Sequence, residues 1–154
     1  MNIITTTNFN EALKEIKKGG EKGEKTIVLS QDDEFNRKIL EKAKIDIFII
    51  NEELENKDYS KQRNSGLNEV LAELAAKNKV KIGIDIEKIM KKNGKEQAKC
   101  LARLAQNILL CKKAKTDIII FPENKLKDKR AIVSLLLTLG LDTKRAEKAV
   151  QESF

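Results

Sequence analysis

Apolar residues along this chain fall into short runs of β-branched side chains, separated by longer stretches with helical spacing. The short runs predict strands at residues 2–5, 26–29, 45–50, 80–84 and 117–121. In the other stretches apolar residues recur at intervals of three and four, which is the spacing of one buried helix face. The predicted helices are residues 9–16, 35–43, 69–77, 86–90, 95–115, 131–139 and 143–151. Strands that alternate with helices predict an α/β fold with mostly parallel strands.

Residues 63–85, with the sequence RNSGLNEVLAELAAKNKVKIGID, join a polar turn, a helix and a strand without a break. Asn68 is a predicted N-cap, and Asn78 is predicted to end the same helix. The following strand ends at Asp85. This succession is typical of one unit of a parallel sheet.

The string RNSGLNEVLAELAAKNKVKIGI resembles the signature segment of the ribonuclease P protein component 3 family, the thirty-kilodalton subunit of archaeal and eukaryotic RNase P. The basic step before the Leu-rich helix and its LGL turn, KRAIVSLLLTLGL, also fits the family's pattern. The resemblance implies a barrel-like fold related to the polymerase and histidinol phosphatase group. A complete (β/α)8 barrel usually needs about 200 residues or more. With 154 residues, we expect a single domain over residues 1–154 with a partial or open TIM-barrel-like fold.

Charge is divided unequally along the chain. Residues 1–60 carry 10 Lys and Arg against 13 Asp and Glu, whereas residues 61–154 carry 21 against 11, giving balances of −3 and +10. A cationic half favours an anionic partner such as nucleic acid. A solvated lysine-rich surface is the alternative. Aromatic residues make up only 4% of the chain, so contacts to phosphates and to RNA shape are more plausible than base stacking.

The candidate RNA-binding residues are basic side chains near predicted helix and strand ends. They are Arg63, Lys77, Lys79, Lys95, Lys99, Arg103, Lys127, Lys129 and Arg130. Lys95, Lys99 and Arg103 recur every fourth residue, which predicts one basic row that phosphates could neutralise. Arg130 comes just before the Leu-rich helix, in a loop expected at the carboxyl edge of the sheet.

Arg63 and Asp85 each have two competing interpretations. The planar guanidinium of Arg63 suits phosphate, but an ion pair with Asp46 or Asp85 is also possible. Asp85 occupies the position of a catalytic carboxylate in a barrel enzyme, but it is also an ordinary N-cap for the next helix. The polar stretch 51–62, which is long for a βα turn, is a candidate functional loop.

The chain contains no His, which removes imidazole-based nucleophilic catalysis and imidazole metal ligands. Cys100 and Cys111 are predicted on one helix about 16 Å apart along its axis, too far for a disulfide. We therefore expect no catalytic residue, no metal site and no bound cofactor in this chain, and two cysteines in the apolar core.

The resemblance implies a protein subunit of ribonuclease P, the ribonucleoprotein that removes the 5′ leader of precursor tRNA. It further implies that the RNA subunit, with Mg²⁺ at its active site, performs the hydrolysis. The implied partners are the RNase P RNA, precursor tRNA indirectly and protein component 2, in a heterotetramer. No apolar run is long enough for a membrane span, so a cytoplasmic location is expected. The alternatives are a stand-alone metal-dependent phosphoesterase using carboxylates around Asp85, and a protein-only scaffold.

Overall fold

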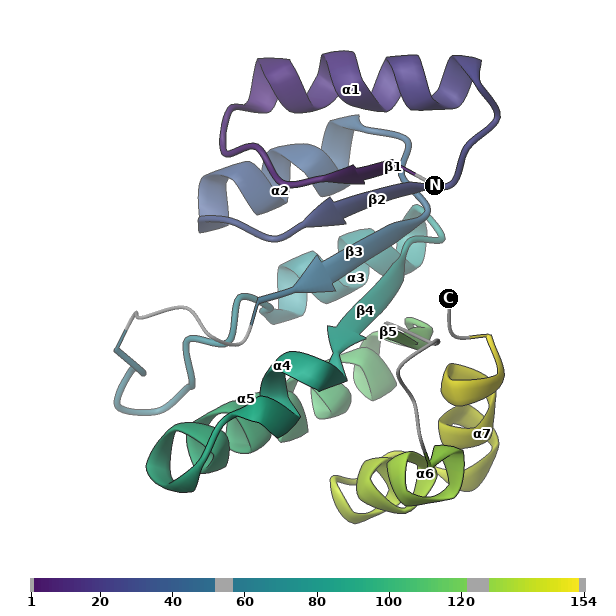
Figure 1. Ribbon diagram of the computed structural model, residues 1–154. Helices are drawn as coiled ribbons and strands as arrows, with labels where there is room; N and C mark the ends of the chain where they lie inside the picture. The colour runs from purple at the N-terminus through teal and green to yellow at the C-terminus, as the bar shows by residue number, and fades with distance from the viewer. Residues whose placement is uncertain (1, 52–56, 122–127, 153–154) are drawn as a thin grey trace.

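Five parallel strands form one sheet in the computed structural model, which describes residues 2–51, 57–121 and 128–152 (Figure 1). The strands are β1 (Asn2–Ile4), β2 (Thr26–Leu29), β3 (Ile47–Ile50), β4 (Lys81–Asp85) and β5 (Ile118–Phe121). Their order in the sheet is their order in the sequence, and each pairs in parallel with the next. This succession is the one that a barrel of β/α units uses, here as an open sheet. The predicted α/β fold is confirmed.

A helix follows every strand. The helices are α1 (Phe9–Glu21), α2 (Asp33–Lys42), α3 (Glu69–Lys77), α4 (Ile86–Lys91), α5 (Gly94–Ala114), α6 (Lys129–Thr138) and α7 (Thr143–Gln151). The predicted cap Asn68 is confirmed, because its side chain accepts a hydrogen bond from the Leu71 N–H at 2.9 Å. Asp85 likewise caps α4 by accepting from the Lys88 N–H. Local polar side chains therefore decide where these helices begin.

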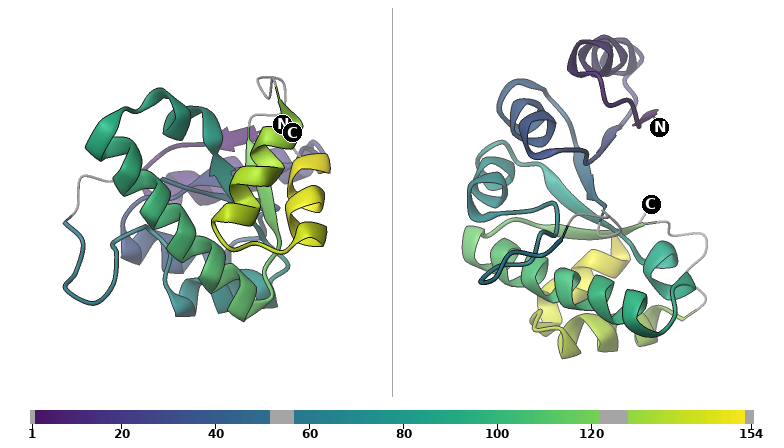
Figure 2. Two further views of the ribbon diagram at one scale, coloured as in Figure 1. Left: turned by 90° about the horizontal axis from the view of Figure 1, so that it is seen from below. Right: turned by 90° about the vertical axis from the view of Figure 1, so that its left-hand side faces the viewer.

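The two faces of the sheet have separate apolar clusters. One face packs Ile4, Val28, Phe48 and Ile82 against the helices, and α1, α2, α3 and α5 follow one another around this side (Figure 2). On the other face the small cluster contains Ile27, Ile47, Ile49 and Ile119. Strands buried on both faces explain why their sequences are continuous apolar runs rather than alternating ones.

The longest helix, α5, is buried along the predicted apolar stripe. Cys100, Leu104, Ile108 and Cys111 are buried there, and both cysteines are free thiols in the core, as predicted. Burial raises the pKa of the Cys111 thiol to about 12, so this group stays protonated near neutral pH. Among the described helices, none combines the length and apolar character that a membrane crossing requires.

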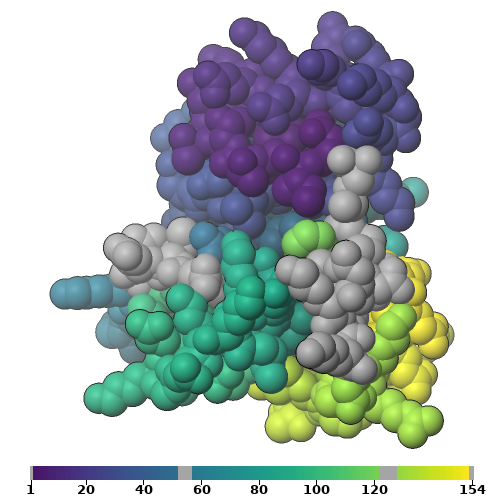
Figure 3. All heavy atoms as spheres, in the orientation of Figure 1, coloured from purple at the N-terminus to yellow at the C-terminus, as the bar shows by residue number. Residues whose placement is uncertain are grey.

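The space-filling view shows how the chain is divided in space (Figure 3). The N-terminal elements form one end of the molecule, and α4 to α7 form the other. Residues 61–154, which carry the +10 balance, include α3 and β4 as well as α4 to α7.

Candidate nucleic-acid interface

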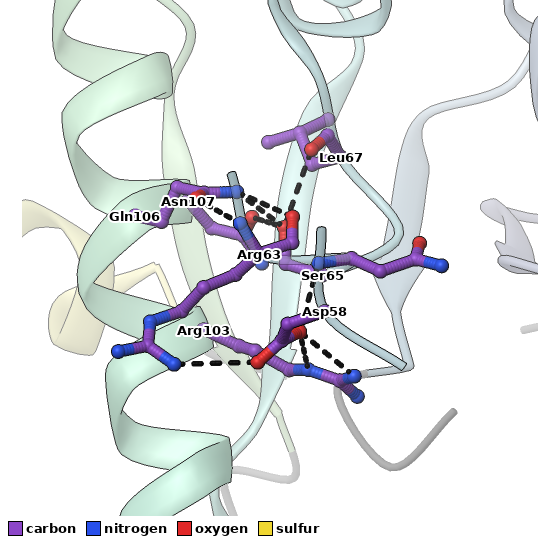
Figure 4. Close-up of polar contacts among 8 residues, drawn as sticks. Asp58, Arg63, Ser65, Leu67, Arg103, Gln106 and Asn107 are labelled. Atoms are coloured by element: carbon purple, nitrogen blue, oxygen red, sulfur yellow. Dashed lines mark hydrogen bonds and ion pairs between the residues drawn. The ribbon is translucent and has the colours of Figure 1, made fainter. Parts of the chain in front are cut away.

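Residues 58–65, which precede α3, contact α5, and the carboxylate of Asp58 holds several of these contacts (Figure 4). Its Oδ1 accepts hydrogen bonds from Arg103 Nε and Nη2, both at 3.1 Å, and from the Asn64 N–H at 2.9 Å. Its Oδ2 lies 3.3 Å from Arg63 Nη1. Asp58 therefore bridges two arginines that come from different elements.

The two arginines differ in burial. The Arg103 side chain is 1% exposed, whereas that of Arg63 is 48% exposed. A buried guanidinium needs a partner because its desolvation is costly. Arg103 therefore fixes Asp58, and Asp58 in turn orients Arg63, which keeps part of its guanidinium open to solvent.

A side-chain amide holds the Arg63 backbone. Gln106 Oε1 accepts from the Arg63 N–H at 2.9 Å, and Gln106 Nε2 donates to the Arg63 carbonyl oxygen at 2.9 Å. Ser65 and Asn107 form a buried hydrogen bond nearby, in which Ser65 Oγ donates to Asn107 Oδ1 at 2.6 Å. Arg63 is thus fixed at its backbone by Gln106 and at its side chain by Asp58.

The pKa of Asp58 reflects opposing causes. Desolvation acts to raise this pKa, but the Asn64 N–H and the guanidinium groups of Arg103 and Arg63 outweigh it and hold the pKa below its ordinary value. The resulting stabilisation is present above the pKa of an unfolded aspartate, about 3.9, and is lost as the pH falls through the lower folded-state value.

We expect Asp58→Asn to show this dependence in urea unfolding between pH 7 and pH 3. The gap in the free energy of unfolding between wild type and variant should be constant above about pH 5. It should narrow below about pH 4, where the Asp58 carboxylate of the unfolded wild type binds a proton before that of the folded protein does. A gap of unchanged size at about pH 3 would contradict the assignment of the ionised carboxylate as the stabilising group.

The structure corrects the predicted basic row on α5. Lys95 and Lys99 are exposed, but Arg103 is buried and paired with Asp58. An α-helix of 3.6 residues per turn rotates about 40° for each four-residue step, so two steps carry Arg103 off the exposed row and towards the interior. The prediction that Arg103 lies in an exposed RNA-binding row is therefore wrong.

The other predicted residues that the structure describes lie in two places. Lys77 and Lys79 are exposed at the end of α3, and Lys129 and Arg130 are exposed in the first turn of α6. Lys129 and Arg130 border a groove of about 420 Å³ between α6 and α7. Lys127 lies outside the described residues. The described candidates therefore lie on separate elements, α3, α5 and α6, and are not gathered into one pocket.

The alternative interpretation of Arg63, an ion pair with a nearby carboxylate, is confirmed, but the partner is Asp58 and not Asp46 or Asp85. Asp46 accepts from the Thr26 N–H at 2.8 Å, and Asp85 caps α4 and pairs with Lys88 at 3.7 Å. Of the two interpretations of Asp85, the structure shows the N-cap. In the described ranges, no three His, Cys, Asp or Glu side chains are grouped so that they could hold a metal ion.

Comparison with known proteins matches residues 5–154 to the family model described as RNase P subunit p30. The chain belongs to this family. A ribonuclease P protein component 3 of Methanococcus maripaludis is 32% identical over 117 residues, covering 76% of this chain and 47% of that protein. One from Methanosarcina acetivorans is 28% identical over 128 residues, covering 80% and 50%. The chain thus spans about half the length of these relatives.

A solved structure supports the RNase P subunit p30 assignment. A chain in the cryo-EM structure of archaeal ribonuclease P with mature tRNA superposes with a TM-score of 0.78 and 25% identity, over 97% of this chain and 63% of that chain. The resemblance to the ribonuclease P protein component 3 family and the barrel-like fold that it implied are both confirmed.

Sequence reasoning on this member of the p30 family missed Asp58, Gln106 and Asn107. Asp58 lies in the polar stretch that was predicted as a functional loop, and nothing in its local spacing points to an arginine 45 positions away. Gln106 and Asn107 do carry a signal, because two adjacent amides interrupt the apolar pattern of a long helix.

Proposed function

We propose that this chain is an RNA-binding protein subunit of a ribonuclease P that removes the 5′ leader of precursor tRNA. The observation that carries the proposal is the superposition of nearly the whole fold on a chain of archaeal ribonuclease P. In this role the protein stabilises the RNA fold by offsetting repulsion between phosphates.

The surface chemistry supports contact with phosphates. Within the described residues, Lys95, Lys99 and Arg130 form no ion pair, whereas Lys113 on the same helix as Lys99 pairs with Glu69. Unpaired cations can neutralise phosphates without first breaking an internal contact. Tyr59, which is 62% exposed, is the one exposed aromatic side chain in the described ranges. Stacking of RNA bases needs exposed aromatic rings, so this surface is poorly suited to it. A structured RNA fits this surface better than a single strand.

The division of labour follows from the same chemistry. We propose that the RNA subunit performs the hydrolysis with Mg²⁺ at its own active site, and that this chain contributes no catalytic group. Protein component 2 is the proposed protein partner, in a heterotetramer, and the proposed location is the cytoplasm. The alternative of a stand-alone phosphoesterase is not favoured, because Asp85 serves as a cap and the family assignment names a ribonuclease P subunit.

Filter binding to RNase P RNA across a salt series tests the proposal. We expect Lys99→Ala and Arg130→Ala each to reduce the slope of log affinity against log salt by up to about 0.9, the contribution of one phosphate contact. Thermal stability should hardly change, since both side chains are exposed.

The matched control is Lys113→Ala, which removes an exposed cation from α5 that is already paired with Glu69. Its slope should fall less than that of Lys99→Ala. Equal slopes for wild type, Lys99→Ala and Arg130→Ala would show that these two side chains do not contact phosphate.

A further inference from the structure

Among the described helices, α1, α3, α5 and α6 end in the same hydrogen-bonded turn, in which one residue has a positive φ. The N–H of that residue bonds the carbonyl three positions back, and the N–H of the next residue bonds the carbonyl five positions back, which is the Schellman motif. At the end of α3, Val80 N–H donates to Ala75 O at 2.9 Å and Lys79 N–H to Ala76 O at 3.2 Å. The residues with positive φ in these turns are Gly23 after α1, Lys79 after α3, Lys115 after α5 and Gly140 after α6.

Lysine is an unusual choice at this position. The φ angles of Lys79 and Lys115 are 57° and 60°, in the left-handed region that disfavours residues with a Cβ. Gly23 and Gly140 occupy the equivalent position in α1 and α6 without that cost. The chain therefore uses glycine at two of the four turns and accepts backbone strain at the other two.

The two strained lysines line one cleft. The turns after α3 and α5 enclose a volume of about 320 Å³ at the edge of the sheet where β4 and β5 begin, the edge that the strand arrows of Figure 1 point away from. Lys79, Lys81, Lys115 and Asp117 supply its charged walls. Ala75, Ala76 and Val80 have short side chains that leave the space open.

The other charged groups of this cleft are already paired. Lys81 pairs with Glu152 at 2.7 Å, and Asp117 pairs with Lys148 at 2.7 Å. In the part of the chain that the structure describes, the ammonium groups of Lys79 and Lys115 are exposed and form no ion pair. These two lysines, one in each of the turns that line the cleft, leave it with a net positive charge that an anion would neutralise.

We propose that this cleft is a phosphate-binding site, in which the ammonium groups of Lys79 and Lys115 bind one phosphate group from two sides. The expected ligand is a phosphate of the RNA backbone, and this identification of the ligand rests on the proposed function. The site lies at the edge of the sheet where the strands begin. Arg63 follows β3 in the chain, and β3 ends at the opposite, carboxyl edge. RNA held at both edges would wrap around the outer helices α3 and α5.

The test replaces both lysines by the residue that the turn prefers, in Lys79→Gly/Lys115→Gly. Thermal unfolding should show a higher Tm, by about 2–4 °C for each site, because the strain at positive φ is removed. Filter binding to RNase P RNA should show the opposite trend, with weaker affinity and a salt slope lower by up to about 1.8. A merely structural role for these lysines would not produce opposite changes in stability and affinity.

Two matched controls isolate the cleft. Lys17→Gln/Lys18→Gln also removes two positive charges, but from the exposed surface of α1. Its slope of log affinity against log salt should stay closer to that of wild type than the slope of the double glycine variant does. Gly23→Lys places a lysine at the equivalent turn position after α1, which is not part of the cleft. A Cβ at position 23 meets no atom within 4 Å. It should lower Tm by an amount like that gained at one cleft site, and it should not strengthen RNA binding.

A second measurement distinguishes the source of the phosphate. Inorganic phosphate should raise the Tm of wild type more than chloride at equal ionic strength, and this effect should vanish in the double glycine variant. If that effect is seen but RNA binding matches the α1 control, the site holds a free phosphate compound. If neither measurement separates the double variant from its control, the site is refuted, even where wild type binds RNA. If wild type does not bind RNA, the proposed function fails, and the phosphate measurement alone decides the cleft.

Discussion

Replacing Arg103 by alanine is expected to lower the free energy of unfolding by about 3–5 kcal/mol. The substitution breaks a buried ion pair, leaves Asp58 without its main partner and opens a cavity where a fully buried side chain stood. For a chain of this length the loss corresponds to a fall in Tm of roughly 6–20 °C. Denaturant and thermal unfolding followed by circular dichroism would measure it.

Arg63→Ala is the matched comparison, because it removes the other guanidinium that pairs with the Asp58 carboxylate. Arg63 is 48% exposed, so its loss should cost no more than about 1 kcal/mol. Its effect should appear in RNA binding instead, as a lower affinity and salt slope. Similar stabilities for Arg103→Ala and Arg63→Ala would show that burial does not distinguish the two ion pairs.

Replacing Gly83 by valine is expected to destabilise the sheet by about 3 kcal/mol. Gly83 lies in β4 beside β3, and a Cβ there would come within 2.8 Å of Ile49 Cγ1 and 3.1 Å of Ile47 Cγ2. These isoleucines belong to the small cluster on the second face of the sheet, so the branched side chain would have to displace packed atoms. Chemical denaturation would report the change.

The size of the added group sets the controls for Gly83. Gly83→Ala should cost less, about 1–2 kcal/mol, because only one methyl has to be accommodated. Gly20→Ala should stabilise by about 0.5–1 kcal/mol, since Gly20 lies within α1 and a Cβ there meets nothing within 4 Å. A tolerated valine at position 83 would mean that the isoleucine cluster can repack around it.

The sequence was sufficient to predict the order of the elements and where most helices begin, although α1 continues to Glu21, five residues past its predicted end. Apolar runs such as Ile47–Ile50 and the spacing in α5 are local patterns, and the caps Asn68 and Asp85 act on backbone N–H groups three residues away. Parallel pairing follows from the alternation of strands and helices, because parallel neighbours require a crossover. The signature segment 63–85 was similarly readable, since its turn, helix and strand are contiguous.

Only the tertiary structure decided which charges face solvent and which are paired inside. Arg103 differs from Lys99 by one helical step, yet it is buried because the segment from Asp58 to Ser65 covers that side of α5. Asp58 and Arg103 are 45 positions apart, and Arg63 and Gln106 are 43 apart, separations that no local period encodes. The cleft of Lys79 and Lys115 arises in the same way, since two turns 36 residues apart in sequence meet only when β4 and β5 pair.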